Sequence, residues 1–155
     1  MMRGCFATLT AAALVAGCAT SGPTGNDVLT GSIGPGTARL VIYRVSAMGI
    51  AVQPDYVVDG KPVASSQPNG FVMCHLPPGH HEVVVDNFPI SFTPFSSGSE
   101  RMAVNLRAGG TTYLSAAPQM GFYTPGKITL TEVTESQGRT DTANMHQING
   151  DCAKA

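Results

Sequence analysis

Four side chains near the middle of the chain have the types that ligate metal ions. They are Cys74 and His75, before the turn signal at residues 77–79, and His80 and His81 after it. Thiolate and imidazole are ligands that zinc and copper prefer. Adjacent residues of a strand point to opposite faces, however, so only one member of each pair can reach a given ion. We therefore expect no metal site and no cofactor.

A second stretch, residues 121–127, has the spacing of a phosphate-binding loop, GFYTPGK. That motif requires Ser or Thr after the lysine to hold magnesium, and a helix whose N-terminus faces the phosphates. Ile128 stands there instead and opens a β pattern. We therefore expect no nucleotide binding.

Carboxylates and serines form no catalytic pattern either. No serine has the G-x-S-x-G setting of a nucleophile elbow. The close carboxylate pairs are Asp55 with Asp59, and Glu132 with Glu135, and both are typical of turn and surface charge. We predict a protein that is not an enzyme.

Charge and length exclude further classes of function. The 155 residues carry 9 basic and 10 acidic side chains, for a formal net charge of −1, and they contain no basic run. Such a balance lacks the electrostatic surface that nucleic acid requires, so we expect no nucleic-acid partner. The length favours one domain.

The N-terminus has the anatomy of a signal peptide. A basic start at Arg3 precedes an apolar stretch over residues 6–16 that is too short to span a membrane. Residues 15–18, VAGC, resemble the lipobox of bacterial lipoproteins, in which a peptidase cuts before the cysteine and acyl chains are attached to it. We expect residues 1–17 to be removed and Cys18 to carry the lipid.

Several acyl chains on one cysteine would attach the protein to a membrane permanently, because each buried methylene contributes about 0.8 kcal/mol. Ala19 follows Cys18, whereas an aspartate there tends to retain Gram-negative lipoproteins in the inner membrane. The resemblance therefore implies an outer-membrane location facing the periplasm, with the inner membrane as the alternative.

Composition divides the mature chain into three parts. Residues 18–36 are rich in Gly, Ser, Thr and Pro and predict a flexible tether, with an ordered strand over residues 28–33 as the alternative. Residues 37–135 predict the folded domain. Residues 136–155 form a polar C-terminal tail with a short helix expected over residues 142–147, and the sequence leaves open whether this tail docks.

Short apolar runs separated by turn signals predict an all-β fold, a small antiparallel β-sandwich of about seven strands. Residues 39–45 are apolar on both faces, as in a central strand. Asp59 and Gly60 suit a tight hairpin, and Pro62 after them favours a sheet edge. The other expected strands cover residues 56–58, 61–64, 71–76, 81–85, 101–106, 111–116 and 127–133.

The order of several short motifs over residues 38–116 resembles a family of bacterial lipoproteins that is catalogued as a domain of unknown function. These motifs are RLVIYR from Arg39, YVVDGKPV from Tyr56, LPPGHHEV from Leu76 and LRAGGTTYL from Leu106. The family is similar to the small β-sandwiches called PEGA domains. The resemblance implies a lipid-anchored sandwich, a packing role for His81 and no catalytic residues.

Two cysteines, Cys74 and Cys152, remain once the signal peptide is removed and Cys18 is acylated. An oxidising periplasm favours a disulfide between them. Alternatively, Cys74 is a small buried apolar residue, since it alternates with Val72 and Leu76, and Cys152 is free or paired with another chain.

Apolar side chains also gather in segments expected to be loops. These are Phe88, Phe92 and Phe95 in the long insert after Val85, and Met120, Phe122 and Tyr123 later in the chain. Exposed together, they would form a partner-binding patch; alternatively, they close one end of the core.

Together these features lead us to expect a non-enzymatic binding module that contacts envelope protein or glycan. The alternative is a lipoprotein that inhibits a periplasmic hydrolase through a projecting loop.

Overall fold

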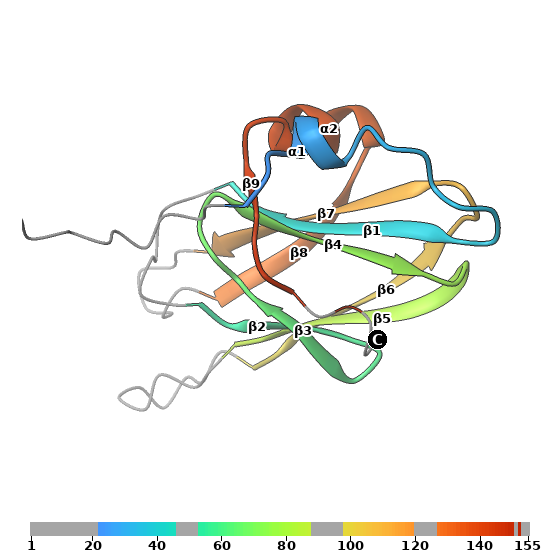
Figure 1. Ribbon diagram of the computed structural model, residues 1–155. Coiled ribbons are helices and arrows are strands. Elements are labelled where there is room, and N and C mark those ends of the chain that lie inside the picture. The colour runs from blue at the N-terminus through green and yellow to red at the C-terminus, as the bar shows by residue number, and fades with distance from the viewer. Residues whose placement is uncertain (1–21, 46–52, 88–97, 120–126, 151, 153–155) are drawn as a thin grey trace, which may run out of the picture.

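The computed structural model describes residues 22–45, 53–87, 98–119, 127–150 and 152. Within these ranges nine strands form two sheets that pack face to face, with two helices on the outer face of the larger sheet (Figure 1). The predicted all-β class is confirmed. No helix in the described part of the chain has the length and apolar character needed to cross a membrane.

The larger sheet has the strand order β8-β7-β1-β4-β9. Its strands are β1 (Ala38–Arg44), β4 (Gly70–Leu76), β7 (Thr111–Gln119), β8 (Lys127–Val133) and β9 (His146–Gln147). All seven residues of β1 are buried, as predicted for a central strand. An antiparallel sheet was predicted, but two of its strand pairs are parallel: β1 with β7, and β4 with β9.

The smaller sheet has the order β3-β2-β5-β6. Its strands are β2 (Asp55–Val58), β3 (Lys61–Ser65), β5 (Gly79–Asp86) and β6 (Glu100–Leu106). Asp59 and Gly60 both have positive φ, 50° and 79°, as a two-residue hairpin of primed type requires. Pro62 lies in β3 at the sheet edge, which confirms both predictions for this hairpin.

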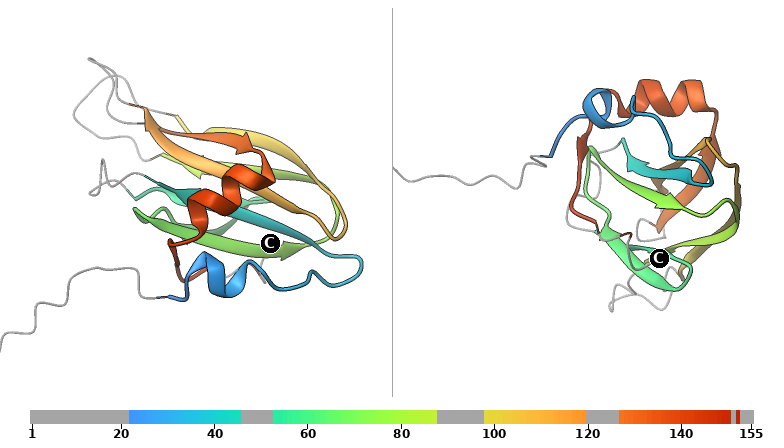
Figure 2. Two further views of the ribbon diagram at one scale, coloured as in Figure 1. Left: turned by 90° about the horizontal axis from the view of Figure 1, so that it is seen from above. Right: turned by 45° about the vertical axis from the view of Figure 1, so that its right-hand side comes forward.

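Two apolar clusters hold the molecule together. The main core lies between the sheets and includes Leu40, Ile42, Val85 and Leu114. A second cluster lies on the outer face of the larger sheet, where the helices α1 (Gly25–Val28) and α2 (Glu135–Thr142) lie side by side across the strands (Figures 1 and 2). This second cover explains why β1 is apolar on both faces.

The prediction of a flexible tether over residues 18–36 is wrong for residues 22–36. The chain forms α1 there, and Leu29 is 5% exposed in the outer cluster. The buried Arg39 guanidinium donates to the carbonyl oxygens of Leu29 and Gly31, at 2.7 and 2.9 Å. Backbone pairing, the Arg39 hydrogen bonds and the apolar side chains of Val28 and Leu29 thus order a segment whose composition suggests flexibility.

The C-terminal segment also belongs to the folded unit. Its helix is α2, over residues 135–142, and not the predicted helix over residues 142–147. Gly138 in α2 lies against the ring of Tyr113, and β9 pairs with the start of β4. Ile148 then enters the main core, 4% exposed.

Strand registers define two ends of the sandwich. At the Gly70 end lie Gly70, Arg44, Asp86 and Gln119. At the opposite, Gly79 end lie Gly79, Ala38, Leu76, Leu106 and Thr111. The ends are about 20 Å apart, the rise of a seven-residue strand. The first described residue, Gly22, lies at the Gly70 end, where its carbonyl contacts His146 Nδ1 at 2.7 Å.

Candidate functional site

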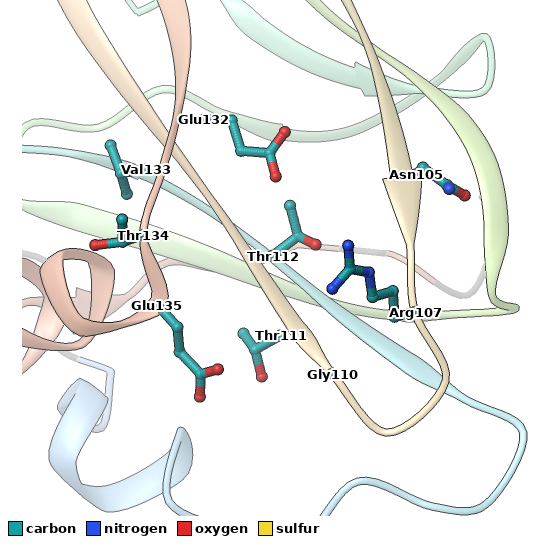
Figure 3. Close-up of a pocket in the computed structure, with 9 residues that line it drawn as sticks. All are labelled: Asn105, Arg107, Gly110, Thr111, Thr112, Glu132, Val133, Thr134 and Glu135. Carbon is teal, nitrogen blue, oxygen red and sulfur yellow. The ribbon is translucent and has the colours of Figure 1, made fainter.

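A polar pocket of about 350 Å³ opens at the Gly79 end of the sandwich. It lies where the end of β6, the start of β7 and the end of β8 meet, beside the first turn of α2 (Figure 3). The lining residues are Asn105, Arg107, Gly110, Thr111, Thr112, Glu132, Val133, Thr134 and Glu135. The volume lies within the range of small-molecule sites.

Polar residues occupy core-facing positions where the sandwich opens into this pocket. On β8, Ile128 and Leu130 point into the main core, and Glu132 occupies the next position on the same face. On β7, Leu114 points into the core and Thr112 comes two residues before it. Departures from a local packing pattern are expected at functional sites.

One positively charged side chain that lines the pocket, Arg107, has no partner among the described residues. Arg107 lies in the exposed turn between β6 and β7, and in the described part of the chain its guanidinium forms no ion pair and no side-chain hydrogen bond. In Figure 3 it points toward Thr112. A guanidinium offers five donors in a planar fork that matches a carboxylate or phosphate.

The two carboxylates of the pocket differ in their partners. Glu135 pairs with Arg139 one turn along α2, at 2.6 Å, so its charge is already balanced. Glu132 is exposed and, within the ranges that the structure describes, has no ion pair. The pocket therefore contains two opposite charges, on Arg107 and Glu132, that do not pair with each other.

The backbone of β8 borders the same pocket. This strand pairs only with β7 among the described strands, so one of its sides is a sheet edge. Near the Gly70 end, the Asn87 side-chain amide covers that edge: it donates to the Ile128 carbonyl at 3.1 Å and accepts from the Ile128 N–H at 3.0 Å. Because an antiparallel ladder alternates, the backbone groups of Glu132 point to the same open side.

The groups that line the pocket suit the binding of a polar ligand. The pocket lining contains no serine, cysteine or histidine. Its hydroxyls and amide, from three threonines and Asn105, both donate and accept hydrogen bonds. Charged groups of both signs complete the set, so the pocket can recognise a polar ligand from several sides.

The residues considered as metal ligands are kept apart. Cys74 is in a disulfide, and His75 and His80 are exposed on different sheets. His81 Nδ1 lies 2.6 Å from Asp59 Oδ2, and its Nε2 lies 2.9 Å from the Pro77 carbonyl. Across the described ranges, no three potential ligands come together.

The contacts of His81 set its charge. Burial opposes ionisation, but the hydrogen bonds to Asp59 and to the Pro77 carbonyl outweigh it and raise the pKa of His81. The Asp59 carboxyl is partly desolvated, yet the hydrogen bonds from His81 and from the Glu82 N–H lower its pKa. The pair therefore acts as a structural ion pair.

The structure joins Cys74 and Cys152 in a disulfide, with Cα atoms 5.2 Å apart and a sequence separation of 78. Cys74 is fully buried in the main core, and Cys152 packs against that core. The bridge therefore attaches the end of the C-terminal segment to β4.

Other predicted site residues lie outside the described residues. They are the lipidation site Cys18 and the partner-binding candidates Phe88, Phe92, Phe95, Met120, Phe122 and Tyr123. The described residues that flank the aromatic segments, Asn87 and Gln119, lie at the Gly70 end.

The pocket itself was not predicted, although one signal for it exists. Extending the alternation of Ile128 and Leu130 by two residues places Glu132 at an inward position of the strand. The closeness of Glu132 to Glu135 in the sequence instead indicates surface charge. Arg107 lines the pocket only because the turn between β6 and β7 folds beside β8, so no local sequence pattern predicts its position there.

Comparison with protein-family models, curated proteins and solved structures finds no match for this chain. The likeness to lipoproteins of unknown function therefore stays a prediction from the sequence.

Proposed function

We propose that this protein is a lipid-anchored, non-enzymatic binding module of the cell envelope, attached to the outer membrane through Cys18 and facing the periplasm. The observation that carries the proposal is the polar pocket at the Gly79 end, with its unpaired Arg107 and Glu132. An anchor at one end would leave the other end free for a partner, and the pocket lies at that other end. Its partner is an envelope protein or glycan.

The length of chain between lipid and domain supports this orientation. Gly22 comes four positions after Cys18, and an extended chain of that length spans about 14 Å at most. Gly22 lies at the Gly70 end, so a lipid on Cys18 would hold that end close to the membrane. The pocket would then face the periplasm, about 20 Å farther out.

The aromatic candidates Phe88, Phe92, Phe95, Met120, Phe122 and Tyr123 remain a proposed partner contact.

Replacing Cys18 with serine tests the anchor. We expect the Cys18→Ser protein to leave the membrane fraction and appear in the soluble periplasmic fraction, because no lipid can be attached. An Ala19→Ser variant is the matched control, since it changes the neighbouring residue and keeps Cys18, and it should remain with the membrane. Membrane fractionation of Cys18→Ser identical to that of the unchanged protein would contradict the anchoring.

Crosslinking in intact cells, followed by mass spectrometry, tests the binding role. We expect the main adduct to be an envelope protein or cell-wall material. A hydrolase as the main adduct would instead support the alternative, an inhibitor lipoprotein.

A further inference from the structure

We infer that the pocket binds a zwitterionic short peptide, one that carries a carboxylate for Arg107 and, within the length of a dipeptide, an ammonium for Glu132. This inference rests on the proposed function and names the ligand class of the same site. It follows from two unpaired opposite charges, hydroxyl and amide groups between them, and an open strand edge beside them.

The charges select a zwitterion. Arg107 and Glu132 line one cavity of about 350 Å³ without forming an ion pair with each other. A ligand with only a negative group would leave the Glu132 carboxylate unpaired, and a purely cationic ligand would leave Arg107 unpaired. A molecule that carries a carboxylate and an ammonium a few ångströms apart satisfies both side chains, as the termini of a dipeptide do.

The carboxylate is assigned to Arg107 because a guanidinium fork forms two parallel hydrogen bonds with a carboxylate. In Figure 3 the Arg107 guanidinium and the Glu132 carboxylate point toward the same region of the pocket, near Thr112. A carboxylate only accepts hydrogen bonds, so Glu132 is complementary to an ammonium, which only donates.

The strand edge favours a peptide over a sugar. Asn87 covers the outward backbone groups of β8 at Ile128, and those of Glu132 point to the same side next to the pocket. A peptide can pair with such an edge through its own backbone. The pocket lining contains no aromatic ring, whereas aromatic faces are the usual platform for stacking a flat apolar ligand surface.

Calorimetry with four forms of one dipeptide tests the inference on the full-length lipidated protein in detergent micelles. The probes are alanyl-alanine, its N-acetyl form, its C-terminal amide and the form blocked at both ends. We expect millimolar binding of alanyl-alanine, since exposed charges interact weakly in water, and about three- to fivefold weaker binding when either end is blocked.

Charge-neutral variants assign each end of the peptide. Arg107→Gln should abolish the preference for a free carboxylate while the preference for a free ammonium remains. Glu132→Gln should have the reverse effect. Arg101→Gln is the matched control, because Arg101 lies on β6 outside the pocket, where it pairs with Glu82 at 3.0 Å, and its affinities should equal those of the unchanged protein. D-alanyl-D-alanine beside the L-form distinguishes a cell-wall peptide from a peptide derived from protein.

Two outcomes would overturn the ligand class. One is equal affinity for free and blocked dipeptides. The other is binding of N-acetylglucosamine at the pocket, shown by its loss in Arg107→Gln, without binding of alanyl-alanine. If either occurs while envelope material is still crosslinked in cells, the proposed function stands without this ligand. Dipeptide binding without any envelope adduct in cells would support this ligand class and contradict the proposed envelope partner.

Discussion

His81 shows how one side chain can hold two segments of the smaller sheet. Its two ring nitrogens face two acceptors, the Asp59 carboxylate and the Pro77 carbonyl. A carbonyl oxygen and a carboxylate both accept, so both ring nitrogens must carry a proton, and the ring is an imidazolium. Its side chain is 10% exposed, which limits screening by solvent. The ion therefore ties the β2–β3 hairpin to the turn before β5.

This contact predicts a pH dependence of stability. The pKa of His81 is raised above its ordinary value of 6.5, so its contribution is complete below pH 6.5 and is lost as the pH rises through the folded-state pKa. We expect this loss to reach about 1 kcal/mol, because Asp59 is partly exposed. Urea unfolding at pH 5.5 and at pH 8.5 measures it.

A His81→Gln variant should lack that part of the pH dependence. His80→Gln is the matched control, since His80 is the exposed neighbour on the other face of β5, and it should retain the dependence. Parallel stability curves for His81→Gln and the unchanged protein between these pH values would refute the role assigned to the ion pair.

At the scale of elements, α2 depends on one glycine for its close approach to the sheet. A Cβ atom on Gly138 would overlap the ring of Tyr113, which is 1% exposed beneath the helix. We expect Gly138→Ala to destabilise the protein by about 1–3 kcal/mol, although alanine favours an isolated helix by about 1 kcal/mol. Urea midpoints measure the difference.

Ser136→Ala, on the exposed side of the same helix, is the control for helix propensity and should change stability little. If Gly138→Ala proved more stable than the unchanged protein, α2 would not pack on Tyr113 as described.

The disulfide fastens the last described element to the core. Cys74 and Cys152 close a loop with a sequence separation of 78, and restricting such a loop in the unfolded chain contributes up to about 4 kcal/mol. We expect Cys152→Ala to lower the free energy of unfolding by about 2–4 kcal/mol and to make it insensitive to reductant. Equal unfolding midpoints for this variant and the oxidised protein would contradict the bridge.

Most strands were predictable, while both chain ends were not. An alternation of apolar and polar residues, as in residues 101–106, is a local signal that defines a strand and its inner face. Residues 22–36 and 135–152 carry few large apolar residues, and they dock through scattered ones, Leu29, Met145 and Ile148, together with backbone pairing. Such docking depends on partners far away in the sequence, so composition alone suggested a tether and a tail.

For the molecule as a whole, we propose that one end of the sandwich lies near the membrane and the other faces the periplasm. The Gly70 end receives the chain from Cys18, and the Gly79 end carries the polar pocket. The predicted signal peptide and the likeness to a lipobox rest on local patterns, so the proposed location follows from the sequence alone. The pocket could not, because Arg107 and Glu132 come together only when the β6–β7 turn folds beside β8.

Site-specific photocrosslinking in intact cells tests the central claim, that the pocket at the Gly79 end is the binding site of an anchored module. A photoreactive side chain replaces Asn105 in the pocket, and a second one replaces Lys61, exposed on β3 at the opposite edge of the smaller sheet. We predict an envelope adduct from position 105 and not from position 61, and its loss when Arg107→Gln and Glu132→Gln are combined. Equal adducts from both positions, or an adduct at 105 that survives the double substitution, would contradict the account.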